Sequence, residues 1–423
     1  MADIKILGKV FNGVSKLKAQ NASGEGTTEF SVGGGGSTEV PENDVIFIDY
    51  DGTILYSYSK SEFANLSALP ANPVHEGLTA QGWNWTLSDA KSYVSVFGGL
   101  VIGQEYNVTD EKIHIFINIP ETSMRKNFQI AIAPSVENSA TIDWGDNNTT
   151  DCSSTTVTTY SHDYSIAGKY EIKISCTNDA KIKFGSNSIV GYDSYTDSSK
   201  AFIQHIIGFI ESVWLSSIFM ANTGSKYFAN CYNLLSCLIA KNCSLTASGS
   251  IPYLLYYCEK IKGFVVHEKE STASANSKTN IGNYVFSQCY NLKYVSLPKS
   301  MNFTSESSPI YICSSAKQLK RLYITDNATK IPYYLISNAC NLEKFIVPSG
   351  VTALGNNAFN ACCLKELVML PTSPPTCPAN ALTYFPNDAK IYVPISENHT
   401  VLDSYKAASG WSTYASQIEE MPT

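Results

Sequence analysis

The sequence predicts a multidomain, mainly β protein with three folded parts. These are a small α/β N-terminal module, an immunoglobulin-like β-sandwich and a C-terminal solenoid of short repeats. A short apolar phrase recurs six times between residues 228 and 369, and strand-like alternation dominates residues 121–177. The length of 423 residues also exceeds that of one ordinary domain. With 16% charged residues and a net charge of −7, the composition argues against a nucleic-acid partner.

Residues 1–40 form an N-terminal arm by composition. Loose alternation at Ile4, Ile6 and Val10 is followed by small and polar residues and by the glycine run at 33–36. Such a run is a flexible tether. We expect this arm to stay disordered or to order only against a partner. Its first residues lack the apolar core of a secretory signal, so we expect no export by the general pathway.

Residues 41–120 are expected to form the small α/β module. Apolar strands are indicated at 45–48 and 113–119, and short helices are expected to begin near residues 61 and 86. Trp83 and Trp85 are the expected core of this module. We expect the module to anchor the chain to its assembly.

The sequence DYDGT at Asp49–Thr53 has two interpretations. It resembles the first motif of the haloacid-dehalogenase phosphatases, which implies a nucleophilic carboxylate and a second acid-base carboxylate. The alternative is a tight turn, in which Asp and Gly serve the backbone. About 70 residues separate this motif from the next domain, too few for a doubly wound sheet, and the turn is therefore favoured. We expect no catalytic residue, no metal and no cofactor.

Residues 121–178 carry short strands separated by polar turns. DWGD at 143–146, YSHDY at 160–164 and AGKY at 167–170 resemble the PKD-type immunoglobulin-like domain. The resemblance implies a β-sandwich that acts as a spacer without catalysis. Asp143 and Asp146 could also bind calcium, but turn formation is the favoured interpretation.

The repeats follow a linker with degenerate first copies at 179–224, occupy residues 225–385 and end in a cap at 386–423. Each copy places a large apolar residue, then a small one, then Leu or Ile, at roughly three-residue steps. Solenoid units of this kind bury their apolar side by stacking on the next copy. The predicted repeat core comprises Phe228, Cys231, Leu234, Leu255, Cys258, Ile261, Phe286, Cys289, Leu292, Leu319, Leu342, Phe359 and Cys362.

The cysteines of this slot are predicted to be packing residues. Ala316 and Ala339 fill the same position in two copies, and free cysteine packs as a small apolar side chain. The twelve cysteines of the chain show no Cys-x-x-Cys spacing and no partnering histidine pair. We therefore predict neither zinc nor redox chemistry at these positions.

The outward-facing positions of the repeat strands are the candidate binding surface. Lysine recurs just after the core Leu or Ile, beside an apolar and aromatic row, and such a surface could hold an acidic or sugar ligand. The alternative is that lysine only solvates and protects the sheet. The candidate residues are Lys262, Lys293, Tyr294, Ser296, Lys320, Arg321, Tyr323, Lys344 and Lys365.

Two resemblances place these parts in a biological setting. Residues 291–298 and 351–362 resemble the BspA-like leucine-rich repeats of bacterial surface antigens, which implies a right-handed solenoid that binds protein or glycan. Residues 49–106 are similar to modules in structural proteins of gut, Bacteroidales-type bacteriophages, where arm, module, PKD-like sandwich and repeats follow in this order.

The functional hypothesis is a non-enzymatic phage virion component, a head or tail fibre or decoration protein assembled in the host cytoplasm. Its N-terminal arm and module would bind other virion proteins, and its repeats would bind a host-surface glycan or protein. We expect a homo-oligomer, with a trimer as the usual state of fibres, and neither nucleic-acid binding nor membrane insertion. A bacterial cell-surface adhesin is the alternative, and a DxDGT-type phosphatase is a remote one.

Overall fold

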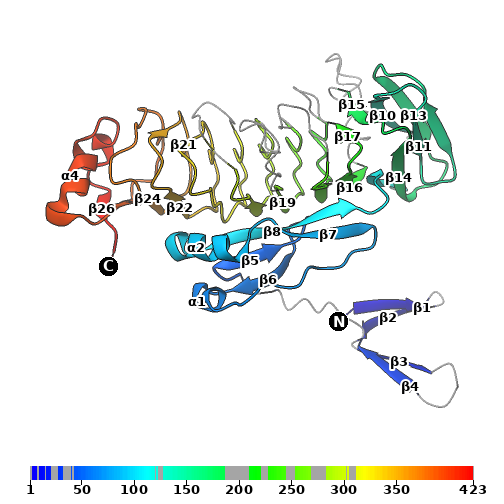
Figure 1. The fold of residues 1–423 in the computed structure, drawn as a ribbon, viewed down its shortest axis with the longest axis horizontal. Coiled ribbons are helices and arrows are strands. Elements are labelled where there is room, and N and C mark those ends of the chain that lie inside the picture. The colour runs from blue at the N-terminus through cyan, green and yellow to red at the C-terminus, as the bar shows by residue number, and fades with distance from the viewer. Residues whose placement is uncertain are drawn as a thin grey trace.

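The computed structural model confirms that the chain is mainly β (Figure 1). It describes residues 40, 42–119, 121, 127–185, 209–220, 227–243, 253–267, 283–301, 303 and 311–422, with the backbone of the strands in 2–31. Within these residues, no helix has the length and apolar character that crossing a bilayer requires. Figure 1 shows the repeats as a row of rungs between a two-sheet β domain and a helical end, with the module alongside.

The arm forms two antiparallel hairpins. The first pairs β1 (Ala2–Ile6) with β2 (Lys9–Val14), and the second pairs β3 (Lys16–Gln20) with β4 (Thr27–Ser31). These strands pair with one another inside the arm. The sequence analysis instead expected the arm to stay disordered or to order only against a partner. The predicted glycine tether lies outside the described residues.

The module is one mixed sheet with two helices. Its strands follow the order β6-β5-β8-β7, in which β5 and β8 run parallel and the two outer pairs are antiparallel. A capping box at Ser59 starts the first helix, and Thr86 starts the second. The elements are β5 (Val45–Ile48), β6 (Ile54–Tyr58), α1 (Lys60–Ala64), β7 (Leu78–Trp83), α2 (Leu87–Phe97) and β8 (Leu100–Val108).

The next domain contains two sheets that continue into the repeats. One sheet has the order β12-β11-β14-β9-β16-β18 and the other β13-β10-β15-β17, and in each the last strands belong to the repeat stack. The domain therefore closes the N-terminal end of the stack instead of hanging from a linker. Its strands are β9 (Ile113–Ile119), β10 (Asn127–Pro134), β11 (Ala140–Asp143), β12 (Thr149–Cys152), β13 (Thr158–Asp163), β14 (Gly168–Cys176) and β15 (Ile182–Phe184).

One strand lies in a different unit from the one expected. The sequence analysis placed residues 113–119 in the module, whereas β9 pairs with β14 and β16 in the six-stranded sheet. Alternation of apolar residues identifies a strand but carries no information about its partner. The structural boundary between module and two-sheet domain therefore falls near residue 110.

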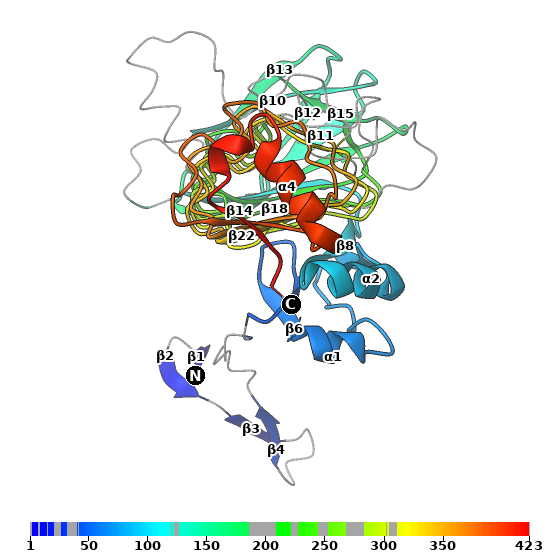
Figure 2. The ribbon, with the colours of Figure 1, turned by 90° about the vertical axis from the view of Figure 1, so that its left-hand side faces the viewer.

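The repeats add short parallel strands from rung to rung, most of them on one side of the stack and a second pair, β21 with β23, in a separate sheet. β16 pairs with β18, β19 with β20, and β22 with β24, all parallel. Seen along the stack, successive rungs superimpose (Figure 2). The strands are β16 (Ile210–Leu215), β17 (Phe219–Met220), β18 (Ser236–Ile239), β19 (Gly263–Val265), β20 (Tyr294–Ser296), β21 (Lys330–Ile331), β22 (Lys344–Val347), β23 (Ala353–Leu354) and β24 (Glu366–Met369).

The C-terminal end of the stack is covered by a small helical cap. Tyr405 and Trp411 are fully buried in it, and they donate hydrogen bonds to the carbonyls of Pro371 and Pro375 at 2.9 and 2.7 Å. A terminal cap with a polar outer side protects the last rung of a repeat stack from water. Its elements are β25 (Lys390–Val393), η1 (Glu397–His399), α4 (Thr400–Ala407), η2 (Ser412–Tyr414) and β26 (Ile418–Glu420).

The interior of the stack contains the predicted repeat core. All thirteen predicted residues are buried, with at most 3% of any one exposed. The thiol of Cys258 donates to the Phe228 carbonyl at 3.1 Å, and that of Cys289 donates to the Leu255 carbonyl at 3.0 Å. Burial raises the pKa of Cys362 to about 11. These are protonated packing thiols, and none of the twelve cysteines, all of which the structure describes, forms a disulfide.

Candidate binding site between the module and the repeats

The module sheet lies against the outward side of the repeat strands, which we call the strand face (β19, β20, residues 321–323, β22 and β24). Ile46, Ile48 and Val101 of the module form one buried cluster with Val265 and Tyr294 of the rungs. The opposite side of the module sheet packs on its own helices through a second cluster that includes Phe47, Phe63 and Phe97. The module is therefore a layer of the molecule between the strand face and two helices (Figures 1 and 2).

Three module glycines bring the two layers into direct contact. A Cβ on Gly52 would lie 2.5 Å from the backbone nitrogen of Gly263. A Cβ on Gly103 would overlap the Val265 side chain, and one on Gly99 would overlap the Tyr323 hydroxyl. Only a residue without a side chain permits this approach. The module is thus fitted to these rungs at van der Waals contact.

The DYDGT motif forms the turn that makes this contact. Asp49 and Thr53 close the turn between β5 and β6 through a 2.9 Å backbone hydrogen bond, and Gly52 adopts a left-handed φ of 85°. The buried Asp49 carboxylate accepts hydrogen bonds from the Tyr106 hydroxyl at 2.8 Å and pairs with His75 Nε2 at 2.6 Å. This geometry favours the turn interpretation, because the carboxylate and the glycine both have local structural partners.

A set of buried hydrogen bonds joins the two layers. The Asn84 amide donates to the Val266 carbonyl at 3.0 Å and to Ser296 Oγ at 2.9 Å. Trp85 Nε1 donates to the Leu297 carbonyl at 2.8 Å. Trp85, one of the two tryptophans expected in the module core, therefore also forms a hydrogen bond with a rung. Each donor satisfies a backbone or side-chain oxygen that water cannot reach, which makes these contacts costly to break.

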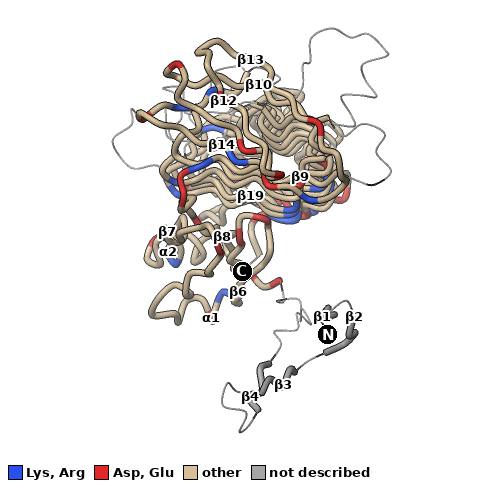
Figure 3. The backbone as a smooth tube through the Cα atoms, turned by 90° about the vertical axis from the view of Figure 1, so that its right-hand side faces the viewer, with Lys and Arg blue, Asp and Glu red and all other residues tan. Residues whose placement is uncertain are grey.

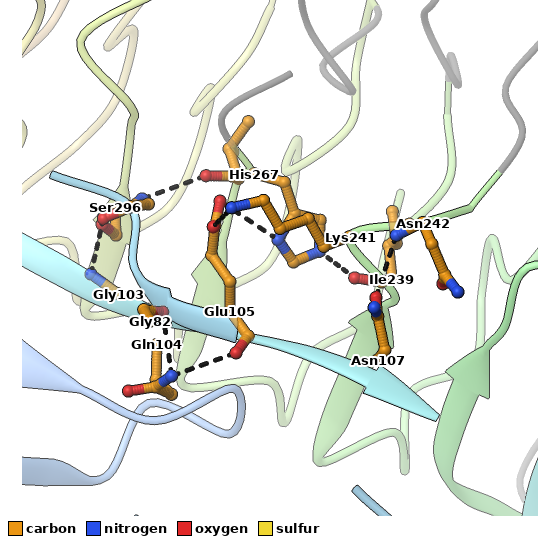
Figure 4. A network of polar contacts seen from close by, with 12 residues as sticks. Gly82, Gly103, Gln104, Glu105, Asn107, Ile239, Lys241, Asn242, His267 and Ser296 are labelled. Atoms are coloured by element: carbon orange, nitrogen blue, oxygen red, sulfur yellow. Dashed lines mark hydrogen bonds and ion pairs between the residues drawn. The ribbon is translucent and has the colours of Figure 1, made fainter. Parts of the chain in front are cut away.

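An ionic network lies at the end of β8 near the two-sheet domain (Figure 4). The fully buried Glu105 carboxylate lies 2.6 Å from Lys241 Nζ and 3.7 Å from His267 Nδ1. Burial alone would raise the pKa of Glu105, but hydrogen bonding and charge from His267 and Lys241 outweigh it, and the pKa lies below its usual value. His267 Nε2 also contacts the Ile239 carbonyl.

A second ionic cluster lies where the chain enters the module. Glu42 pairs with Lys320 at 2.7 Å and with Arg321 Nε at 3.3 Å. The Arg321 guanidinium also donates to the carbonyls of Asn43 and Asp44. Farther along the interface, Lys299 pairs with Asp89 of α2 at 2.6 Å. Lysine and arginine side chains of the rungs therefore form ion pairs with carboxylates at the edge of the module.

This cluster lines one part of a groove of about 580 Å³ between the module and the rungs. One wall is the module segment with Glu42 and Asp44 and the aromatic side of α2. The other wall is formed by two rungs, whose groove residues include Asn341 and Lys344. Seven of the twelve lining residues are charged or polar, so the groove is more polar than the mostly apolar pockets that hold small molecules. The lining residues are Glu42, Asp44, Tyr93, Phe97, Lys320, Arg321, Leu322, Tyr323, Asn341, Glu343, Lys344 and Ile346.

The predicted binding residues divide into three groups: residues that the module covers, residues at the groove, and the remaining lysines. Tyr294 and Ser296 are a correction to the sequence analysis: they face outward from their strand, but the module covers them, and Ser296 is fully buried. Lys320, Arg321, Tyr323 and Lys344 come together at the groove.

The remaining lysines do not form a uniform cationic row. Lys365 pairs with Glu343 at 2.7 Å, and Lys344 of the groove pairs with Glu366 at 2.8 Å. Lys262 and Lys293 have no ion pair with any described residue. Figure 3 shows basic and acidic residues close together along the stack. Of the predicted lysines, Lys320, Lys344 and Lys365 are therefore ion-paired.

Sequence reasoning missed the module wall of the groove. Tyr93 and Phe97 stack on each other at 4.0 Å and are one helical turn apart, a spacing that marks one face of α2. That spacing could have identified a packed helix face. It could not have identified the rungs that lie opposite.

The described residues contain no group of three or more His, Cys, Asp or Glu side chains that could hold a metal ion. At the candidate calcium position, Asp143 accepts from the Gly145 amide at 2.9 Å, and Asp146 pairs with His162 at 2.7 Å. His162 in turn stacks on Trp144. The local hydrogen bonds match the turn interpretation of these aspartates.

Comparison with known proteins identifies the repeats. Residues 209–308 and 269–365 match the family described as BspA type Leucine rich repeat region, in six copies. This part of the chain is therefore similar to BspA-type leucine-rich repeats. No curated protein matches the chain.

Two solved structures are similar to part of the chain. A leucine-rich repeat protein from Bacteroides ovatus ATCC 8483 is 17% identical over 49% of this chain and 53% of that one, with a TM-score of 0.30. A leucine rich cell surface protein from Faecalibacterium prausnitzii A2-165 is 12% identical over 48% of this chain and 64% of that one, with a TM-score of 0.25. The match spans less than two thirds of either protein.

Proposed function

We propose that this chain is a non-enzymatic, adhesin-type binding protein that holds a host-surface glycan or protein in the groove between module and repeats. The observation that carries the proposal is the groove itself. It gathers Lys320, Arg321, Tyr323 and Lys344 against module residues that include Glu42, 278 positions before Lys320.

The groove suits recognition of a polar ligand better than catalysis. Its charges are balanced, because Glu42 already neutralises much of Lys320 and Arg321, and Lys344 is paired with Glu366. Tyr323 adds an aromatic surface with a hydroxyl. A ligand would exchange hydrogen bonds with such groups while covering the rings, which is how polar surfaces gain specificity. A stiff repeat stack keeps this geometry fixed.

The test compares groove and non-groove variants of the full chain on intact gut Bacteroidales cells and on a glycan array. The double substitution Lys344→Ala and Asn341→Ala should weaken binding at least tenfold, because it removes two polar groups of the rung wall. Lys390→Ala is the matched control, since Lys390 is a paired lysine outside the groove. Equal binding of the two variants would reject the groove as the ligand site.

The setting of this binding function is a separate proposal. We infer that the arm hairpins and the module attach the protein to a phage particle, with the repeats displayed outward as a fibre or decoration. The two hairpins that precede the module support this assignment, because they offer paired strands outside the repeat stack. A bacterial cell-surface adhesin is the alternative setting, and BspA-type repeats are compatible with it.

Fractionation separates the two settings. Mass spectrometry of purified particles and of washed bacterial envelopes should find the chain in the particles, and removal of residues 1–40 should abolish that association. Recovery in envelopes alone would support the cell-surface alternative. Light scattering of the full chain and of the chain without residues 1–40 would test the proposed trimer, which should require the arm.

A further inference from the structure

Tyrosines at the same position of four successive repeats form a continuous stack along the turn side of the rungs. The ring centroids of Tyr253 and Tyr284 are 4.6 Å apart, those of Tyr284 and Tyr311 are 4.4 Å apart, and those of Tyr311 and Tyr334 are 4.0 Å apart. Neighbouring rings are within 13° of parallel. All four side chains are half-buried, so part of each ring reaches solvent. We call these four residues the tyrosine ladder.

The backbone at these positions does not favour tyrosine. The φ angles are 56°, 60°, 54° and 53°, in the left-handed region where glycine and asparagine are preferred. Asn357 occupies the corresponding position of the next rung with a φ of 55°. A turn of this shape therefore forms without an aromatic residue. Four tyrosines in a row are more than the turn itself requires.

A second row of polar aromatic residues extends the ladder. Tyr256 lies with its ring centroid 6.3 Å from that of Tyr284, and Tyr257 lies 6.4 Å from Tyr290. Gln288 connects the row, since its amide donates to the Tyr256 hydroxyl at 3.2 Å and accepts from Tyr290 at 3.0 Å. We call the ladder and this row together the tyrosine patch.

The inner rings cover one another, so a ligand meets mainly their edges and hydroxyls. Burial, and then repulsion from neighbouring tyrosines, raises the pKa of Tyr284 and Tyr311, which keeps both phenols protonated and able to donate. The ladder therefore offers a row of uncharged donors and acceptors, repeated on four successive rungs. Among the described residues, Lys317 lies 5.0 Å above the Tyr290 ring and places a cation against the patch.

We propose that the tyrosine patch binds a neutral polysaccharide laid along the stack. A polymer with hydroxyls repeated along its length complements hydroxyls repeated along the rungs, and tyrosine supplies apolar contact with little loss of side-chain freedom. The described part of the patch offers many hydroxyls and one ring-bound lysine, Lys317, which suits a neutral polymer better than an acidic one. The inference rests on the proposed binding function but uses other residues, because no member of the patch lines the groove.

The test removes hydroxyls without disturbing the stack. Tyr284→Phe with Tyr311→Phe keeps both rings and both left-handed positions, whereas Tyr384→Phe changes an exposed tyrosine outside the patch and serves as the control. The full chain is run in native gels that contain a mannan, a galactan, a glucan or a xylan. We expect retardation by at least one polymer, at least tenfold weaker binding for the double variant, and no change for the control.

The possible outcomes separate this inference from the function on which it rests. Retardation that is equal in wild type and double variant, or absent with all four polymers, would overturn the patch as a neutral-polysaccharide site. Binding of wild type to a protein or an acidic polymer alone would do the same. The groove variant Lys344→Ala with Asn341→Ala should bind the polymer normally. If wild-type chain binds gut cells but no neutral polymer, the proposed function survives and the patch does not.

Discussion

The rungs that the module covers and the rungs that it leaves open have the same backbone arrangement but different outward residues. Under the module, the first outward position of successive rungs is Gly263, Tyr294 and then Arg321, which pair in parallel register. Past the module sheet, at the groove and farther along the stack, the equivalent positions of β22 and β24 are Lys344 and Glu366, again in register. The covered rungs therefore present a glycine without a side chain, a tyrosine ring and a hydrogen-bonded guanidinium. The open rungs present alternating charges.

This difference shows that the repeat pattern determines the interior and leaves the exterior free. Core positions such as Leu292 and Leu342 are the same in covered and open rungs, because each fills the same space between neighbours. Outward positions instead follow what lies opposite them. Gly263 meets the backbone of Gly52, whereas Lys344 meets water and the carboxylate of Glu366. A binding surface therefore has to be sought rung by rung.

The largest expected effect comes from closing the gap between the layers. Gly52→Ala places a methyl group 2.5 Å from the Gly263 nitrogen and also forces alanine into a left-handed conformation. We expect a loss of about 1–2 kcal/mol from the conformation and about 1–3 kcal/mol from overpacking. Urea unfolding followed by tryptophan fluorescence measures the total.

Gly82→Ala is the matched control for this variant. Gly82 has a similar φ of 92° but no atom within 4 Å of the added methyl group. It should lose only the conformational part. If both variants lose the same stability, the close contact between module and rungs does not exist in solution.

The next largest effect comes from the buried amide that joins the layers. Asn84→Ala leaves the Val266 carbonyl and the Gly103 amide without their partner, and we expect a loss of about 2–3 kcal/mol. Hydrogen exchange should become faster in β8 and β20 but not in β24. Asn72→Ala, at an exposed position of the same module, should change neither quantity. Uniform acceleration over all rungs would contradict a local joint.

A smaller, pH-dependent effect is expected at Glu105. Because its pKa is lowered on folding, the unfolded state takes up the proton first as the pH falls below about 4.5, the usual value for Glu. The stability that this carboxylate provides is therefore present above that pH and is lost through the folded pKa. Glu105→Gln should cost about 1–2 kcal/mol at pH 7, since Lys241 loses its partner but is partly hydrated.

The same substitution should also flatten the acid side of the stability profile. Urea midpoints from pH 3 to pH 7 would measure this, with Glu343→Gln as the control for an exposed, ion-paired glutamate. Profiles of wild type and Glu105→Gln that stay parallel over this range would contradict a pair that is fully formed only in the folded state.

The smallest effect is expected on the open rungs. The Lys365 and Glu343 side chains are both well exposed, and such pairs add little because water and salt screen them. Lys365→Ala should leave the melting temperature unchanged within error at 150 mM salt. A clear loss of stability there would mean that the open strand face is as tightly organised as the covered one.

The repeats were predictable from the sequence, and the docking of the module was not. The core position that Cys289 occupies recurs in each repeat at a nearly regular spacing. Its contacts are with the neighbouring rung, which is the neighbouring repeat in the sequence. The bond between Asn84 and Ser296 joins positions 212 apart, and neither position stands out in its own segment. The signal that was available is Gly263, because a glycine inside a strand pattern often marks a close approach by another backbone.

Zero-length carbodiimide cross-linking with mass spectrometry tests the docked module most directly. The account predicts that Lys299 is joined to Asp89 and Lys320 to Glu42, since these pairs lie 2.6 and 2.7 Å apart. Lys365 and Glu343, 2.7 Å apart within the stack, provide the internal positive control. Formation of the control link without either module link would contradict the claim that the module covers the strand face.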